Sequence, residues 1–152
     1  MAISVRVHAR SRRVLLDVPH QNRHHRRGIE QALYEIGDIN VAEVRRLIRT
    51  GTRTGRVYIF RGRRHKASAP GEIPANRSGR LARSSEYRVH GWYQMTFGET
   101  APYAIYLEGG TRRMAPRPHM VVTVNNTAGQ ALAALHRYPA EAIGASGRGR
   151  AR

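Results

Sequence analysis

The stretch NRHHRRGIEQALYEIGDINVAEVRRLIRT, residues 22–50, carries the strongest structural signal in the chain. Arginines in its last turn complement the helix dipole, and Gly51 is a suitable C-cap. Gly37 and Asn40 weaken the middle of the segment and would allow a bend. The pattern predicts one long amphipathic helix, because the apolar residues recur every three or four positions on one face: Ile29, Leu33, Ile36, Val44, Leu47 and Ile48.

Short segments on both sides of this helix predict antiparallel strands. Residues 3–8 alternate apolar and polar side chains, as a half-buried strand does, and residues 12–18 form a second short run. Residues 54–60 are rich in β-branched and aromatic side chains. Residues 81–98 favour two strands joined by a turn at Gly91. We therefore expect four or five strands.

The last third of the chain favours helix but leaves two interpretations open. Residues 102–108 favour one short helical turn that ends at Gly109. Either Pro118 starts a single helix that runs to about Tyr138, or the β-branched residues 120–124 form a strand before a shorter helix. Both interpretations place a helix near the C-terminal end.

Together these elements predict an α+β fold in one small domain, with the long helix packed on an antiparallel sheet and a C-terminal helix. A chain of 152 residues fits one such domain, which we expect to span residues 1–143. Residues 61–80 hold two prolines and few apolar side chains, and predict a long exposed arm. The Gly- and Arg-rich residues 144–152 predict a flexible basic tail.

The charge of the chain restricts its partners. Its 27 Lys and Arg residues against 10 Asp and Glu give a net charge of +17, which favours nucleic acid, an acidic protein surface or an anionic membrane. The absence of cysteine excludes disulfides, thiolate zinc sites and a cysteine nucleophile. No apolar run approaches the ~20 residues that span a membrane. Residues 1–20 lack the apolar core of a signal peptide, so we expect neither an anchor nor export.

No set of residues supports catalysis. The acidic residues between 30 and 43 fit a solvated helix face paired with nearby arginines. His20, His24 and His25 lie among arginines that would repel a metal cation. The chain has no nucleotide-binding, metalloprotease or serine-hydrolase motif. We therefore expect no enzyme, no metal and no cofactor.

Two basic segments are the candidate binding sites. The first is FRGRRHK, residues 60–66, in which Arg61, Arg63, Arg64 and Lys66 lie beside aromatic residues. These cations would contact nucleic-acid phosphates or an acidic protein partner, and the sequence favours neither.

The second segment combines aromatics, arginines and a turn fixed by glycine and proline, which is a composition typical of protein interfaces. Glu108 would pair with Arg112 or Arg113, or with an arginine of a neighbouring copy; alternatively, the tyrosines of this segment complete the core. The candidate interface residues are Tyr103, Tyr106, Leu107, Glu108, Gly109, Gly110, Thr111, Arg112, Arg113, Met114, Pro116, Arg117 and Pro118.

Two stretches, ASAPGEIPANRSGRLARS (67–84) and YAIYLEGGTRRMAPRPHM (103–120), together resemble the head–tail joining proteins of long-tailed, siphophage-like bacteriophages, also called neck or tail-completion proteins. Ser78 stands where that family usually has Thr, Gly110 where an aromatic is common, and His119 where Phe is usual.

The resemblance implies a structural virion protein of the neck, assembled in the host cytoplasm as a homo-oligomeric ring. A sixfold ring would match the tail and is favoured; a twelvefold ring would match the portal. Its neighbours would be a head adaptor or stopper protein and a tail terminator or tube protein, with genomic DNA passing through. The resemblance also implies that the 61–80 arm reaches an adjacent subunit or ring. A basic nucleic-acid-binding protein is the alternative.

Overall fold

The structure is a computed structural model that describes the backbone of residues 4–7, 13–17 and 23–147 and the side chains of residues 26–138. Its elements follow the order β1 (Ser4–Val7), β2 (Arg13–Asp17), α1 (Arg23–Thr50), β3 (Val57–Phe60), β4 (Arg63–Lys66), α2 (Arg80–Arg83), β5 (Ser85–His90), β6 (Gln94–Glu99), α3 (Ala104–Gly109) and α4 (Met120–Gly147).

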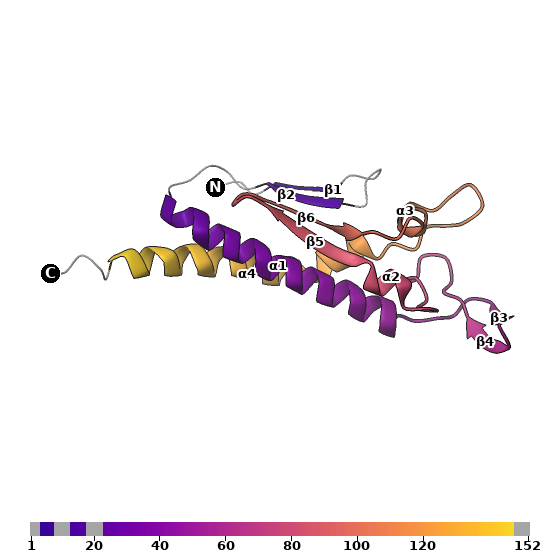
Figure 1. Ribbon diagram of the computed structural model, residues 1–152. Helices are drawn as coiled ribbons and strands as arrows, with labels where there is room; N and C mark the ends of the chain where they lie inside the picture. Colours follow the sequence, from indigo (N-terminus) through magenta and orange to yellow (C-terminus); the bar gives the residue numbers. More distant parts are fainter. Residues whose placement is uncertain (1–3, 8–12, 18–22, 148–152) are drawn as a thin grey trace.

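Two long helices lie side by side against a four-stranded antiparallel sheet, whose strand order is β1-β2-β6-β5 (Figure 1). Strands β3 and β4 form a separate hairpin that projects at one end of the elongated molecule (Figure 1). Central strand β6 contributes Met95 and Phe97 to the core, where they meet the buried face of α1. The predicted α+β fold, with the long helix on an antiparallel sheet and a C-terminal helix, is confirmed.

Helix α1 runs unbroken through the two residues that weaken it in isolation. A Cβ atom on Gly37 would lie 2.3 Å from Cδ2 of Tyr87, so the glycine lets the ring of β5 pack directly on the helix backbone. Asn40 is buried, and its Oδ1 accepts a hydrogen bond from the Thr127 hydroxyl of α4 at 2.6 Å. Both residues are contact points of α1 with other elements, and tertiary packing outweighs their low helix propensity.

Two helical glycines provide a matched stability test. Gly129 in α4 has open space where its Cβ would be, whereas the Cβ position of Gly37 is occupied by the Tyr87 ring. We expect Gly129→Ala to raise the free energy of unfolding by about 0.5–1 kcal/mol through helix propensity. We expect Gly37→Ala to lower it by about 1–3 kcal/mol through overpacking. Urea denaturation of both variants checks the pair, and equal effects would contradict the packing of Tyr87 on α1.

Helix α4 resolves the alternative left open by the sequence. It begins at Met120, so the β-branched residues 120–124 are helical and no strand precedes them. Thr123 and Thr127 are buried; the Thr123 hydroxyl donates to the carbonyl of His119 at 2.7 Å and that of Thr127 donates to Asn40, so both are satisfied inside the core. The helix continues to Gly147, so residues 144–147 of the predicted flexible tail are helical. Residues 148–152 lie outside the described residues.

The predicted arm is exposed mainly in its first part. Strand β4 pairs with β3, and both strands carry mainly exposed side chains. Residues 67–80 instead fold back on the domain, with Ser68 and Pro74 buried. The backbone N–H of Gly71 donates to the carbonyl of Pro116 at 3.0 Å. Residues 67–80 are therefore held against the domain in part, by this backbone pairing and by the burial of Ser68 and Pro74, while Pro70, Gly71, Arg77, Ser78 and Arg80 are exposed.

Candidate protein interface

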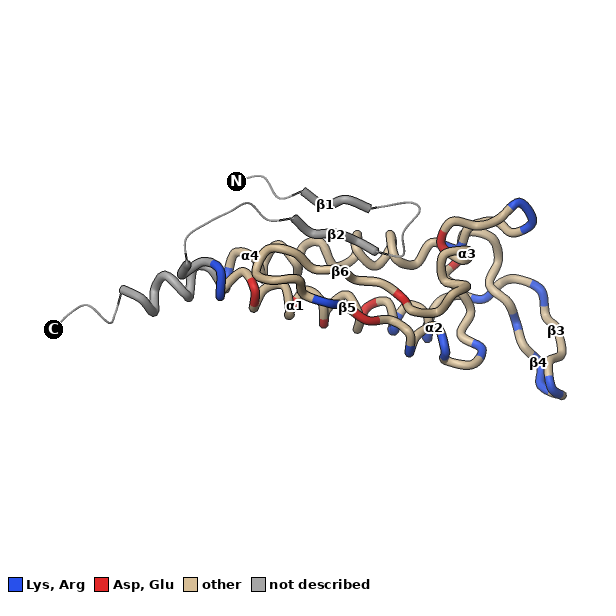
Figure 2. Tube along the Cα trace, turned by 45° about the horizontal axis from the view of Figure 1, so that its top comes forward, with Lys and Arg blue, Asp and Glu red and all other residues tan. Residues whose placement is uncertain are grey.

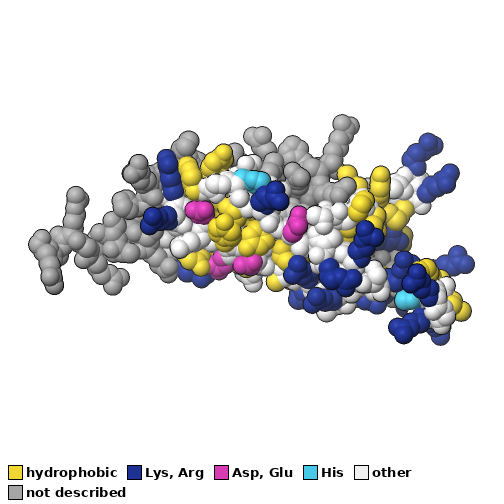
Figure 3. Space-filling view, viewed as in Figure 1, with side chains coloured by type: hydrophobic (Ala, Val, Ile, Leu, Met, Phe, Trp, Pro, Cys, Tyr) yellow, Lys and Arg dark blue, Asp and Glu magenta, His cyan; other side chains and the backbone are white. Residues whose placement is uncertain are grey.

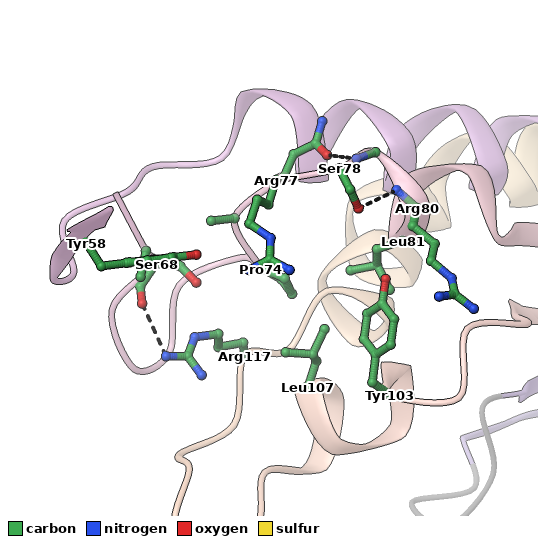
Figure 4. A pocket seen from close by; sticks show the side chains of 14 residues that line it. Tyr58, Ser68, Pro74, Arg77, Ser78, Arg80, Leu81, Tyr103, Leu107 and Arg117 are labelled. Atoms are coloured by element: carbon green, nitrogen blue, oxygen red, sulfur yellow. Dashed lines mark hydrogen bonds between the residues drawn. The ribbon is translucent and has the colours of Figure 1, made fainter. Parts of the chain in front are cut away.

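The two segments singled out in the sequence meet at one end of the molecule. Arg117 donates from Nη2 to the carbonyl of Ser68 at 3.2 Å, and its backbone N–H donates to the carbonyl of Leu107 at 2.7 Å. A groove of about 290 Å³ lies between the segments (Figure 4). Tyr58 of β3 and Tyr103 beside α3 both line it. Residues 67–81 and 103–117 thus line one groove, whereas the candidate cations Arg61, Arg63, Arg64 and Lys66 do not line it.

The hairpin at this end exposes apolar and aromatic side chains. All four residues of β3 are exposed, with Ile59 at 77% and Phe60 at 38%. Two arginines lie over the Phe60 ring. The guanidinium of Arg77 is 4.1 Å from the ring centroid, and the guanidinium of Arg61 is 5.5 Å from it. Aromatic and arginine side chains held together in this way are typical of the energetic centres of protein interfaces.

The same end concentrates positive charge. Figure 2 shows Lys and Arg gathered on the β3–β4 hairpin, around α2 and on the loop after α3. Glu72 is the one acidic residue between positions 51 and 84, and it is engaged in accepting hydrogen bonds from Thr54 and Ala69. The cations of this stretch are Arg53, Arg56, Arg61, Arg63, Arg64, Lys66, Arg77, Arg80 and Arg83.

The loop after α3 is a closed and exposed tip. The N–H of Thr111 donates to the carbonyl of Met114 at 2.7 Å, which leaves Arg112 and Arg113 exposed between them. Gly110 has φ +72, and a Cβ there would lie 2.8 Å from the Met114 carbonyl oxygen, so this position requires glycine. The turn thus fixes the backbone that carries the two exposed arginines.

The aromatics beside this tip are surface residues. Tyr103 is 37% exposed and Tyr106 is 56% exposed, so the alternative that they merely complete the core is not supported. Their exposure is compatible with an interface role.

Glu108 has a different role from the one predicted. Its carboxylate accepts the backbone N–H groups of His119 (2.8 Å), Met120 (3.0 Å) and Val121 (3.1 Å), and so caps the first turn of α4. The expected pair with Arg112 or Arg113 of the same chain is wrong, because the carboxylate turns inward to the helix end. Glu108 joins α3 to α4.

A buried ion-pair cluster, which sequence reasoning missed, lies behind this cap. His119 is 0% exposed, with Nε2 2.7 Å from Oε2 of Glu99 and Nδ1 3.0 Å from Oε2 of Glu108. Burial would lower the pKa of His119, but hydrogen bonds to both carboxylates outweigh it and raise that pKa to about 10. Although burial opposes it, hydrogen bonding by His119 lowers the pKa of Glu108 to about 2. The imidazolium joins β6, α3 and α4.

The cluster is suited to stability rather than to catalysis. Its histidine is closed off from solvent, so a substrate has no access to the imidazole. The sequence carries no local signal for it, since Glu99 and His119 are 20 positions apart. Within the part of the chain whose side chains are described, no group of three or more metal-binding side chains is arranged to hold an ion. Among those residues, no helix combines the length and apolar character needed to cross a bilayer.

Comparisons with known proteins add no family assignment: no family model matches the chain, and no curated protein and no solved structure is significantly similar to it.

Proposed function

We propose that this protein is a structural subunit of the neck of a siphophage-like virion, where it forms a ring that joins the head connector to the tail. The resemblance of residues 67–84 and 103–120 suggests the family, and the exposed β3–β4 hairpin is the observation that carries the proposal. Its neighbours are a head adaptor or stopper on one side and a tail terminator or tube protein on the other. A hexamer is favoured over a dodecamer.

The hairpin supports this role because its marginal stability and its exposed apolar side chains are both unfavourable features in an isolated monomer. A two-stranded hairpin is marginally stable in water by itself. This one exposes Val57, Tyr58, Ile59 and Phe60 together, and contiguous exposed apolar side chains mark binding surfaces. Arginines around it would set the register with a neighbour through bidentate pairs. Assembly of the oligomer would bury these apolar and aromatic side chains and order the neighbouring arginines.

The hairpin variant Ile59→Asp tests the proposal. Since Ile59 is 77% exposed, we expect the free energy of unfolding to change by less than about 0.5 kcal/mol. We expect the same variant to lose ring formation and head-to-tail joining, because a carboxylate would be buried at the interface. Light scattering gives the particle mass, and joining of purified heads and tails gives the activity. Leu132→Asp, at a 49% exposed site of α4, is the matched control. Normal joining by Ile59→Asp would refute the role of the hairpin.

A nucleic-acid-binding protein is the second candidate, and the exposed cations of β4 beside Tyr58 and Phe60 favour it. In that case DNA affinity falls log-linearly with salt, with a slope of about −0.9 for each phosphate contact. The double variant Arg63→Glu/Arg64→Glu then weakens DNA binding and flattens the slope. A ring whose mass is unchanged across the salt range, formed without DNA, excludes this candidate as the main function.

A further inference from the structure

A second exposed surface lies on α1, far along the chain from the hairpin. Glu30, Tyr34 and Asp38 follow one another at spacings of four, which places them on one helix face; we call them the acidic stripe. Tyr34 is 49% exposed, and its ring meets Tyr87 of β5 edge-on at 6.4 Å. The Tyr87 hydroxyl donates to Oδ1 of Asp38 at 3.0 Å. The stripe thus presents aromatic rings next to carboxylates.

The stripe and the hairpin are separated on the surface and opposite in charge. Figure 3 shows apolar side chains over the middle of α1 with Asp and Glu around them; Lys and Arg are most numerous towards the β3–β4 end, and a few also border the apolar area. Glu86 of β5 is a further exposed carboxylate, and the remaining described carboxylates have partners within the chain: Glu35 with Arg137, Glu43 with Arg46, Glu72 with Thr54, and Glu99 and Glu108 with His119. The acidic stripe is the place on this face where carboxylates accompany an exposed aromatic ring.

The overall charge restricts how two copies can meet. Each copy carries +17, so most relative orientations of two copies are repulsive. The hairpin placed on the acidic stripe is an attractive orientation, since its arginines meet carboxylates and its apolar residues meet Tyr34. Because the two surfaces are different patches of one chain, the contact is heterologous, and a repeated heterologous contact generates a ring when its rotation closes.

We propose that the β3–β4 hairpin of each copy docks on the acidic stripe of the next copy. In this contact Ile59 packs beside Tyr34, while Arg64 and Lys66, which lie on the same face of the hairpin as Ile59, approach Glu30 and Asp38. The inference deepens the proposed ring-forming function and rests on it. It commits to a second copy of this chain as the occupant of both surfaces.

Disulfide trapping tests the contact directly, because the chain has no cysteine of its own. A Tyr34→Cys variant is mixed with an Ile59→Cys variant and oxidised, and denaturing electrophoresis measures the covalent dimer. We expect at least tenfold more dimer than from the control mixture of Leu132→Cys with Ile59→Cys. The chain that carries both Tyr34→Cys and Ile59→Cys should give a ladder that ends at the copy number of the ring. A yield equal to the control overturns the contact.

A charge exchange gives a second, independent readout. Glu30→Arg/Asp38→Arg and Arg64→Glu/Lys66→Glu, each introduced into both cysteine variants of a mixture, should reduce trapping to the control level. A chain that carries all four changes should recover it, because both signs are reversed together. Circular dichroism checks that each variant is folded. Absence of recovery overturns the contact.

The result separates this inference from the proposed function. A discrete ring or normal head-to-tail joining without trapping between positions 34 and 59 leaves the function standing and removes only this contact. Loss of trapping together with the absence of any ring and of joining removes both.

Discussion

Replacing Glu108 with alanine is expected to lower the free energy of unfolding by about 3–5 kcal/mol. The change removes the acceptor of three backbone N–H groups at the start of α4 and one of the two carboxylates that hold the His119 imidazolium. A buried charge that loses a partner is strongly destabilising, and the lost cap adds to it. For a domain of this size the melting temperature should fall by roughly 10 °C. Urea denaturation at about pH 6 measures the change.

Two further variants isolate the cause. Glu86→Ala removes an exposed carboxylate from β5 and should change stability by less than about 0.5 kcal/mol. Glu108→Gln keeps an oxygen acceptor for the helix end but removes the charge beside His119, so an intermediate loss is expected. If Glu108→Ala is as stable as Glu86→Ala, the carboxylate does not join α3 to α4.

Local patterns were sufficient for most of the fold. The apolar spacing of residues 22–50 predicted α1 because a helix needs only a periodic face and good ends. The alternation in residues 81–98 and the turn at Gly91 predicted the β5–β6 hairpin, and Gly91 has the positive φ that such a turn needs. Residues 81–83 are the exception, since they belong to the short helix α2. Elements with a local apolar pattern were therefore found, whereas β4, the sixth strand where four or five were expected, was missed because Arg63–Lys66 has no apolar alternation.

Features that depend on distant residues were missed. Glu99 and His119 are 20 positions apart, and no spacing rule brings them together; the antiparallel sheet and α3 do so. The β-branched start of α4 favoured strand as much as helix, and the cap from Glu108 on another element decides the outcome. The segment after Lys66 looked like a free arm because its pairing with residues 116–117 is invisible in its own composition.

The candidate interface residues likewise differ in whether sequence patterns alone could assign their role. Tyr103, Tyr106, Arg112 and Arg113 are exposed and remain candidates for an interface. Glu108 acts inside the chain, although composition alone placed it with them. Whether a polar side chain in a rigid loop faces outward or caps a neighbouring helix is set by the fold, which short-range sequence patterns do not encode.

The buried histidine also makes stability depend on pH. The pKa of His119 is about 10 in the folded protein against an ordinary 6.5, so its contribution is complete below pH 6.5 and is lost as pH rises through 10. The pKa of Glu108 is about 2 against an ordinary 4.5, so its contribution is complete above pH 4.5 and is lost as pH falls through 2. The two ranges overlap between pH 4.5 and 6.5, where the cluster stabilises most.

We expect the free energy of unfolding to fall as pH rises above 6.5, at up to about 1.4 kcal/mol per pH unit for this single proton. The variant His119→Gln separates this loss from other titrations. It should be about 3 kcal/mol less stable than the natural chain at about pH 6, because Glu99 keeps a buried carboxylate without a cation. Its stability should change far less between about pH 6 and pH 9, so the two urea-denaturation curves converge at high pH. Parallel pH profiles for the two chains would mean that His119 is neutral in the folded protein and that the cluster is held by hydrogen bonds alone.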